Sequence, residues 1–314
     1  MWLYFRYGIT RGLNYKITLM KNKIERVAIY SKDNSTKTRQ GVNRLVNEFC
    51  RRGIAIQIFQ TSDDTAVCPG GQLIESFTNL SQVSGLPDLV LSVGGDGTFL
   101  ETILKIKDYE IPVAGVNTGR LGFLANISEE ELSHSIDMLC QGEYKTIERT
   151  LLEIVHPSPL FEGSSSSALN EITIQKADLS MITINVFIDD TYLNTYWADG
   201  LIISTATGST AYNLSVGGPI LSPEDESFII SPIAPHNLTI RPIIVSGESR
   251  LRMVIEGRSN EYLATCDFRS KRLPFSQELH IEKSAHKLRT VMLRGMDFYS
   301  TLRNKLMWGA DRRN

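Results

Sequence analysis

In its first third the chain reads Leu89-Val90-Leu91-Ser92-Val93-Gly94-Gly95-Asp96-Gly97-Thr98. The first five residues are mainly apolar and do not alternate with polar ones, which predicts a strand buried on both faces. The glycines that follow predict a sharp turn. A helical pattern of apolar residues then runs from Phe99 to Ile106. A strand, a glycine loop and a helix in this order indicate an open α/β sheet, in which ligands bind at the carboxyl ends of the strands.

The pattern repeats on both sides of this segment. Apolar runs at 27–30, 54–59 and 112–116 predict three more strands, and helical spacing from 36 to 52 predicts a helix between the first two. Residues 61–86 are polar and predict a loop or a weak helix. Strands that alternate with helices predict an N-terminal α/β domain with a parallel sheet.

The second half has a different pattern. From about residue 146 to 282, segments of alternating polarity are separated by Gly, Pro, Ser and Asp, which predicts an antiparallel, sandwich-like β-rich domain. Residues 163–167 predict a flexible loop, and 296–306 an amphipathic helix. We therefore divide the chain into an N-terminal extension or disordered tail (1–23), an α/β nucleotide-binding domain (24–125), a β-rich domain (126–282), and a C-terminal segment packed back on the first domain (283–314).

Composition excludes several classes of protein. The chain has 314 residues and a formal net charge of -2, without the basic excess of a nucleic-acid or membrane-surface binder. No run of about 18 apolar residues is present, which argues against a membrane span. The four cysteines are scattered and the histidines do not cluster, so no zinc site is expected and the usage is typical of a cytoplasmic protein.

The glycine loop carries the chemistry. Glycines let the backbone approach a polyphosphate closely, and Thr98 lies three residues before Glu101, the spacing of a capping box that would start a helix whose free N–H groups face an anion. A carboxylate among phosphates is electrostatically costly, so Asp96 should hold a divalent cation, accept a proton from an acceptor hydroxyl, or bind that hydroxyl. The alternative is an ordinary tight turn with Asp favoured for turn chemistry. We expect transfer of phosphate from a nucleotide triphosphate to a small hydroxyl-bearing acceptor.

Three further segments fit this chemistry. Residues 117–124 follow the next strand, and Arg120 there either reaches a phosphate or lies on the surface of a glycine-rich crossover. Residues 204–212 offer five hydroxyl side chains before Tyr212, which suits ribose and phosphate recognition, although such a loop alone is more often a solvated turn. Asn170-Glu171 can bind sugar hydroxyls or an adenine edge, but means little alone.

Taken together, these segments resemble the NAD kinase family over roughly residues 24–290. The resemblance rests on Gly94-Gly95-Asp96-Gly97-Thr98, residues 117–124, Asn170-Glu171, Asp199-Gly200, residues 207–212, Pro235-His236 and Arg241-Pro242. It implies phosphorylation of the adenosine 2′-hydroxyl of NAD, with ATP as donor and a divalent cation, Mg²⁺, bound with ATP rather than by a cluster of side chains. It also implies a site in the cleft between two domains and a homo-oligomer, a dimer or a tetramer.

The resemblance assigns roles to particular residues. Asp96 resembles the catalytic proton acceptor. The positions expected to bind phosphate and ATP are Gly94, Gly95, Gly97, Thr98, Asn117 and Arg120. The positions expected to bind NAD are Asp96, Gly97, Asn170, Glu171, Trp197, Asp199, Thr207, Thr210, Ala211, Tyr212, Asn213, Leu214, Ser215 and Ala234. Asp199 would bind the nicotinamide end, and in this family often comes from a neighbouring subunit.

Two positions depart from the family pattern. Trp197 stands where many relatives carry a basic residue, and Phe268 stands where many have the glycine of an Asp-Gly turn, so that turn should differ. A lipid kinase that shares the glycine loop, and a module that senses NAD or NADPH without turnover, are the alternative functions. The first would need an apolar acceptor groove, and the second would have no need of Asp96.

Overall fold

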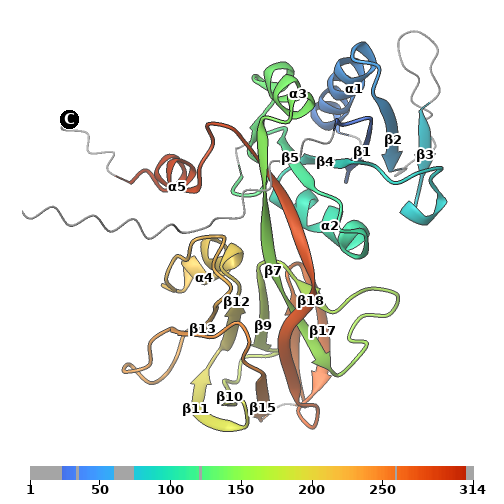
Figure 1. The fold of residues 1–314 in the computed structure, drawn as a ribbon. Helices are drawn as coiled ribbons and strands as arrows, with labels where there is room; N and C mark the ends of the chain where they lie inside the picture. The colour runs from blue at the N-terminus through green and yellow to red at the C-terminus, as the bar shows by residue number, and fades with distance from the viewer. Residues whose placement is uncertain (1–22, 33–34, 60–73, 120–121, 259, 309–314) are drawn as a thin grey trace, which may run out of the picture.

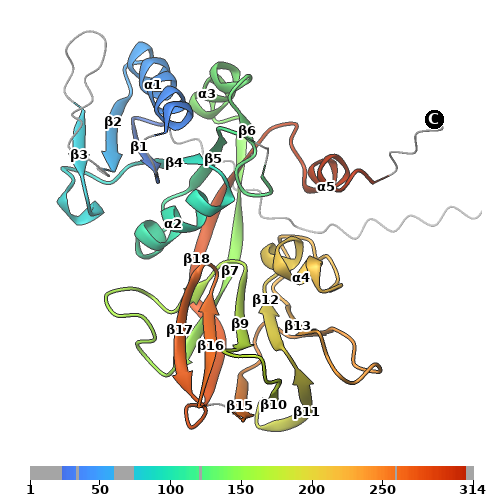
Figure 2. The same ribbon diagram turned by 180° about the vertical axis from the view of Figure 1, so that it is seen from behind.

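The computed structural model describes residues 23–32, 35–59, 74–119, 122–258 and 260–308. The expected N-terminal extension, apart from its last residue, and Arg120 lie outside these ranges. Two halves lie one above the other, joined by two long strands, β7 (Tyr144–His156) and β18 (Leu279–Leu293) (Figures 1 and 2).

The N-terminal half contains the expected parallel sheet. Its strands pair in the order β5-β4-β1-β2-β3, and short β6 pairs with β5; every one of these pairs is parallel. The strands are β1 (Arg26–Ser31), β2 (Ala55–Phe59), β3 (Glu75–Phe77), β4 (Leu89–Gly94), β5 (Val113–Asn117) and β6 (Ile127–Ser128). The helices and 3-10 turns are α1 (Thr36–Arg51), η1 (Leu80–Gln82), α2 (Asp96–Ile106), η2 (Lys107–Tyr109) and α3 (Leu132–Gln141).

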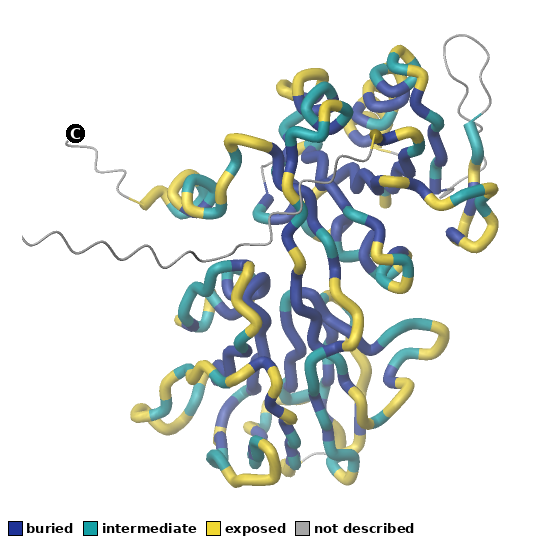
Figure 3. Tube along the Cα trace, in the orientation of Figure 1, coloured by how far each residue is buried: buried dark blue, intermediate teal, exposed yellow. Residues whose placement is uncertain are grey.

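Strand β4 is buried on both faces, as its lack of alternation predicts. Leu89, Leu91 and Val93 join one core with α1 and α3, while Val90 joins a second core with α2 on the opposite face. Figure 3 shows that the central strands of this sheet are buried, while the edge strand β3 is partly exposed. Because β4 is held from both sides, the loop that follows it leaves from a fixed point.

The C-terminal half is a sandwich of two antiparallel layers. One layer is the six-stranded sheet β14-β13-β12-β9-β16-β17, and the other is the antiparallel part of a 12-stranded sheet, β11-β10-β15-β18 with β7 and β8. The two layers share one core, whose largest fully buried side chains are Tyr262 and Phe228. The strands are β8 (Ser167–Ala168), β9 (Glu171–Lys176), β10 (Ile182–Ile188), β11 (Thr191–Ala198), β12 (Gly200–Ser204), β13 (Phe228–Ile233), β14 (Ile243–Val245), β15 (Leu251–Gly257), β16 (Glu261–Cys266) and β17 (Arg269–Pro274).

Strand β18 belongs to both halves. It pairs with β15 near its start and with β5 in parallel at Thr290, so the 12-stranded sheet runs from one half into the other. The expected boundary at residue 282 therefore falls inside one strand. The chain ends in helix α5 (Phe298–Leu306), close to the amphipathic helix expected over 296–306.

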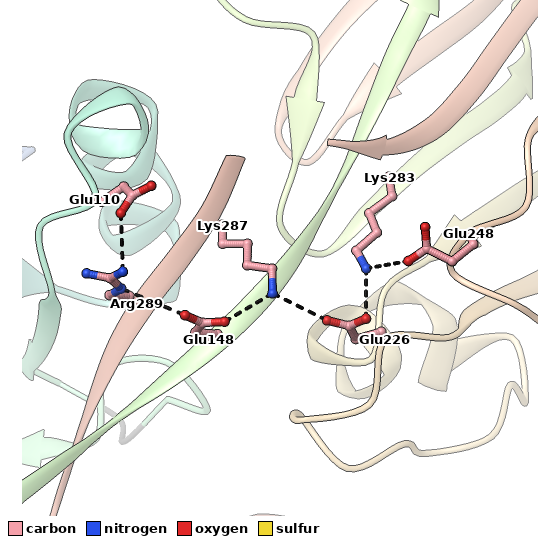
Figure 4. A network of polar contacts seen from close by, with 7 residues as sticks. All are labelled: Glu110, Glu148, Glu226, Glu248, Lys283, Lys287 and Arg289. Carbon is pink, nitrogen blue, oxygen red and sulfur yellow. Dashed lines mark hydrogen bonds and ion pairs between the residues drawn. The ribbon is translucent and has the colours of Figure 1, made fainter. Parts of the chain in front are cut away.

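A chain of charged side chains follows β18. Lys287 contacts Glu148 at 3.1 Å and Glu226 at 3.6 Å, and Lys283 binds Glu226 at 2.7 Å (Figure 4). Glu248 and, through Arg289, Glu110 extend the network at its two ends. Loops from both halves are thus tied to the same strand.

Three elements differ from the sequence-based expectation. The polar stretch 61–86 contains the parallel edge strand β3 and the turn η1, because Phe77 and Leu80 are buried against the sheet. Helix α3 is not predicted at all. Helix α2 begins at Asp96 and not at Thr98, because Gly95 is its N-cap, so the capping box expected from Thr98 and Glu101 is wrong.

Candidate active site

The glycine loop leaves the carboxyl end of β4 as the sequence predicts. Gly94 has φ 152°, and a Cβ there would lie 2.3 Å from Thr98 Oγ1, so a side chain cannot be accommodated. Gly95 and Gly97 are exposed, whereas Thr98 is buried. The free N–H groups of the first turn of α2 therefore face solvent at exposed glycines, which suits an incoming anion.

Asp96 is the first residue of α2, and its carboxylate holds the neighbouring loop. Its Oδ2 accepts the N–H of Phe123 at 3.0 Å, and its Oδ1 accepts those of Leu124 at 3.1 Å and Ala125 at 3.0 Å. Gly122 lies so close that a Cβ there would be 1.9 Å from Oδ1. A carboxylate has about four acceptor sites, so roughly one, on Oδ2, stays open for a substrate hydroxyl.

Asn117 lies beside this loop, at the end of the neighbouring strand. It pairs in register with Gly94, and its Oδ1 accepts the N–H of Gly119 at 2.6 Å. Asn117 is buried and shapes the turn, while Gly119 is exposed. The carboxyl ends of β4 and β5 thus bring the first two motifs together.

Asn170 and Glu171 are positioned by a carboxylate from another strand pair. Asp267 accepts the backbone N–H groups of Leu169 at 2.9 Å, Asn170 at 2.8 Å and Glu171 at 3.2 Å. Asp267 itself takes the left-handed conformation, with φ 52°, whereas Phe268 is not among the positive-φ residues. In the β16–β17 turn the left-handed residue is therefore Asp267, whereas in an Asp-Gly turn it can be the glycine that follows. Phe268 is tolerated because its own position does not require the left-handed conformation.

Glu171 is 8% exposed, and one of its carboxyl oxygens, Oε2, has no hydrogen-bond partner in the described part of the chain. Burial, and then the nearby charge of Asp267, raises the pKa of Glu171 to about 8, against the opposing effect of a hydrogen bond from the Tyr212 N–H. Burial likewise raises the pKa of Asp267. This shift favours the protonated carboxyl of Glu171, which is able to donate a hydrogen bond.

The hydroxyl-rich segment folds against Asn170. After β12 it forms the 3-10 turn η3 (Thr207–Thr210) and the short helix α4 (Tyr212–Ser215), which lie on the side of the C-terminal half that faces the N-terminal half (Figure 2). Thr205 donates its N–H to Asn170 O at 2.9 Å, and a Cβ on Gly208 would lie 2.0 Å from the same oxygen. The Asn170-Glu171 pair and residues 204–212 thus form one rigid unit.

The residues of η3 and α4 differ in how far their side chains are accessible to a ligand. Ser209 and Asn213 are fully buried, and Asn213 uses its amide within the protein, donating to Ser209 O and Pro219 O and accepting from Ser231. Tyr212 and Ser215 are exposed, and Thr210, Ala211 and Leu214 are partly so. In this structure the Asn213 side chain holds the loop, and its neighbours present the accessible surface.

Trp197, Asp199 and Ala234 lie apart from that unit. Asp199 precedes β12 and forms an ion pair with Lys176 at 2.7 Å, whereas Ser204 ends β12 beside Glu171. Trp197 and Ala234 are exposed at the same end as Asp199. At about 3.3 Å per residue the length of β12 separates Asp199 from Glu171 by roughly 15 Å. Tyr212 spans part of this distance, because its hydroxyl accepts a hydrogen bond at 3.4 Å from Gln175, which pairs with Gly200 beside Asp199.

The cavity between the halves brings the first group of motifs together. Phe123 and Leu124, which Asp96 holds, line it on one side, and Thr207 and Thr210 line it on the other. The carboxylate loop and the hydroxyl loop therefore border the same space.

Comparison with known proteins agrees with this geometry. Residues 31–144 match the ATP-NAD kinase N-terminal domain, and residues 169–293 match the ATP-NAD kinase C-terminal domain. The chain belongs to the NAD kinase family. It is 48% identical to an NAD kinase of Cytophaga hutchinsonii over 240 residues, 76% of this chain and 82% of that one. It is 37% identical to an NAD kinase of Christiangramia forsetii over 92% of this chain and 100% of that one.

Two solved structures of the family share the fold. The NAD kinase of Archaeoglobus fulgidus, in complex with ATP, has a TM-score of 0.71 and 26% identity, with 90% of this chain and 98% of that chain covered. Yeast NADH kinase, complexed with NADH, has a TM-score of 0.80 and 22% identity, with 93% of this chain and 89% of that chain covered. An α/β domain followed by a β sandwich is therefore the fold of this NAD kinase family member.

Sequence reasoning missed two residues of the site. Asp267 is noticed only as part of a departure from the family pattern, yet it fixes the Asn170-Glu171 segment. Arg149 of β7 lines the cavity between the halves, and nothing in the sequence around it, which contains several other charged residues, singles it out. Within the described ranges, no helix is long and apolar enough to cross a membrane, and no group of three His, Cys, Asp or Glu side chains gathers as a metal site would require.

Proposed function

We propose that this chain transfers the γ-phosphoryl group of ATP to the adenosine 2′-hydroxyl of NAD and so forms NADP. One observation carries the proposal: the loop held by Asp96 and the loop containing Thr207 and Thr210 line the same cavity. A phosphate loop, a carboxylate with an open acceptor site, and hydroxyl groups that suit a ribose are then available to one bound dinucleotide.

Asp96 would act on the acceptor hydroxyl. A ribose hydroxyl has a pKa far above neutral, so a base that accepts its proton during attack on the γ-phosphorus assists the reaction. Three backbone N–H groups fix the carboxylate, which removes the need to reorient it when substrate binds. The open acceptor site on Oδ2 is where the hydroxyl would bind.

Phosphoryl transfer has a loose transition state, so catalysis consists mainly of positioning and charge stabilisation. The exposed N–H groups at the start of α2 would bind phosphate oxygens. A Mg²⁺ ion would neutralise part of the developing charge. Because Asp96 is largely occupied by N–H groups, the donor's phosphates and water would provide most of the ligands of that ion.

The dinucleotide would extend over two copies of the chain. Asn170, Glu171 and the 207–215 segment would bind the adenosine end. Asp199, Trp197 and Ala234 lie one strand length from Asn170 and Glu171, so they would contribute to the nicotinamide end of a dinucleotide bound to a neighbouring copy. Trp197, Met181 and Leu238 are 45%, 40% and 85% exposed around a shallow hollow, as expected for a surface that pairs with another copy.

A direct assay tests this function. Purified protein with NAD, Mg²⁺ and ATP labelled at the γ-phosphate should form a labelled product that an NADP-specific dehydrogenase accepts as a substrate. A dinucleotide phosphorylated at the 3′-hydroxyl would not be accepted by that enzyme. A long-chain alcohol such as diacylglycerol should remain unlabelled. Tight NADPH binding without any NADP formation, or labelling of the lipid alone, would refute the proposal.

A further inference from the structure

Arg149 is a buried cation that the proposed reaction does not yet use. It lies on β7 with an exposed fraction of 8%. Its Nε donates to Thr290 Oγ1 at 3.0 Å, and its Nη1 donates to Thr207 Oγ1 at 3.4 Å. Burial lowers the pKa of Arg149 to about 10, so the guanidinium remains charged at neutral pH.

This charge lacks a counter-ion. Among the described residues, no carboxylate lies within ion-pair distance of the guanidinium, and its Nη2 has no hydrogen-bond partner. The carboxylate that influences Arg149 most is Glu224, which is instead paired with Lys145 at 3.6 Å. Burying a guanidinium without a carboxylate partner opposes folding. Its Nη2 is not among the fully buried unpaired atoms of the described chain, so it stays accessible to an anion from solution.

The cavity in front of Arg149 offers a place for such an anion. Arg149 lines the space between the halves together with Asn126, Thr207, Thr210 and the Phe123-Leu124 loop. The polar side chains that surround Arg149 are threonine hydroxyls and the Asn126 amide, the remaining described lining residues are apolar, and none of them is a carboxylate. Asp96 accepts the backbone N–H groups of Phe123 and Leu124, so the loop that lines this cavity is the one held by the group that receives the acceptor proton.

We propose that Arg149 binds a phosphate group of a substrate or product in the cavity between the two halves. The inference rests on the proposed function. A planar guanidinium with free N–H donors matches the oxygens of a phosphate ester, which accept two parallel hydrogen bonds. Three sources have this chemistry, the pyrophosphate shared by NAD and NADP, the 2′-phosphate of NADP and the triphosphate of ATP, and the experiment separates them.

A structural role makes a different forecast. If Arg149 only ties β7 to β18 and to η3 through its two threonine contacts, its loss should lower stability and weaken all ligands alike. If it holds a phosphate, replacing an unpaired buried charge by an apolar side chain of similar length should leave the melting temperature of the free protein equal or higher.

The test measures binding by titration calorimetry on the full chain. The variants are Arg149→Met and Arg149→Lys, and Arg289→Met on the neighbouring strand is the control for loss of an arginine. The ligands form two pairs, NADP with NAD and ATP with adenosine. Hydrogen bonds to charged groups predict that Arg149→Met weakens at least one of the phosphate-bearing ligands NADP, NAD and ATP by roughly 10-fold or more, while the affinity for adenosine, which has no phosphate, changes less than about 2-fold.

Loss of affinity confined to NADP would assign the 2′-phosphate, equal loss for NADP and NAD would assign the pyrophosphate, and loss confined to ATP would assign the triphosphate. Arg149→Lys should recover part of the affinity in each case. Unchanged affinities for all four ligands would overturn the proposal, as would a parallel fall in all four accompanied by a lower melting temperature. If native protein binds NAD but forms no NADP, the proposed function fails, whereas the binding comparison for Arg149 can still be read.

Discussion

Three carboxylates in the site differ in what surrounds them, and this decides what each can do. Asp96 is partly exposed and accepts three N–H groups from one loop. Asp267 is enclosed and accepts three from another. Glu171 is buried with one oxygen unpartnered. Asp96 alone of the three combines exposure with an open acceptor site, which suits proton transfer.

The raised pKa of Glu171 predicts a pH dependence of stability. The unfolded carboxyl titrates near its ordinary value of 4.5 and the folded one at about 8, so the folded state holds an extra proton between these values. Stability from this group is therefore complete below pH 4.5 and is lost as pH rises toward 8. Glu171→Gln cannot ionise and should lose this dependence.

The measurement is the melting temperature of native protein and Glu171→Gln between pH 5 and pH 9, roughly the window over which the group titrates. The melting temperature of Glu171→Gln should increase relative to that of the native protein as pH rises. A difference that stays constant across this window would show that Glu171 is already ionised at its lower end.

Single residues show where prediction from sequence stops. The glycine loop and the role of Asp96 can be predicted because they depend on neighbouring residues only, namely a strand, a glycine turn and the carboxylate itself. The partners of Asp96 are not, since they lie 27 to 29 positions further along the chain. Asp267 is nearly 100 positions from the segment it holds, so only the fold reveals its role.

At the scale of elements, the contact of η3 with the Asn170 segment fixes the hydroxyl loop. Gly208→Ala should separate the two, because its Cβ would lie 2.0 Å from Asn170 O and 2.4 Å from Asn170 C, which are backbone atoms and cannot rotate away. We expect a loss of stability of about 1–3 kcal/mol and a KM for NAD raised by roughly 10-fold or more, since misplaced binding groups are costly.

Urea unfolding and NADP-formation kinetics measure these two effects. Gly119→Ala, where a Cβ would have open space, should leave the free energy of unfolding unchanged. A Gly208→Ala protein with native stability and a native KM would mean that this contact does not position the loop.

The charged network along β18 predicts a second pH effect. Hydrogen bonding from Lys283 lowers the pKa of Glu226 below 4.5. Its stabilisation is present above that value and is lost as pH falls through the folded pKa. Glu226→Gln should lower the free energy of unfolding by about 1 kcal/mol or less at pH 7, because the ion pair is partly exposed. In acid, once Glu226 of the native protein is also neutral, the two proteins should be equally stable.

Guanidinium is unsuitable here because it screens ion pairs, so urea melts at pH 7 and near pH 3 give the comparison. A deficit of Glu226→Gln that persists undiminished in acid would assign the effect to packing instead of charge.

Element boundaries follow the sequence where periodicity is strong and depart from it elsewhere. Strand β4 and helix α1 fall within a residue or so of the prediction. The start of α2 does not, because the cap is a glycine whose backbone, and no side chain, makes the turn. Short β3 and helix α3 escape detection, because β3 has only three residues and α3 lacks a side-chain cap.

At the scale of the whole molecule, β7 and β18 tie the halves together. One sheet runs through both halves, and both strands line the cavity between them, β7 with Arg149 and β18 with Thr290. The sequence predicts two kinds of sheet correctly. It could not show that they share strands, because each strand looks the same whichever partner it pairs with.

The positions of Trp197 and Asp199 predict assembly. Trp197→Glu would place a charge in the apolar hollow formed with Met181 and Leu238, so it should shift sedimentation toward a smaller species. NAD affinity should fall with it, because Asp199 would no longer reach a neighbouring site. Tyr299→Glu on α5, at a position 60% exposed, serves as the control and should sediment as native protein does. A monomeric native protein, or an unchanged Trp197→Glu oligomer, would contradict this arrangement.

The account as a whole depends on Asp96 as the base in NAD phosphorylation. The most direct test is the initial rate of NADP formation from NAD and ATP by native protein and by Asp96→Asn. The amide oxygen still accepts N–H groups from the 123–125 loop, so Asp96→Asn should fold, with a loss of about 1–3 kcal/mol for the N–H left unpaired. It should bind NAD within a few-fold of native protein while its kcat falls by roughly 100-fold or more. A folded Asp96→Asn protein that forms NADP at a near-native rate would contradict the account.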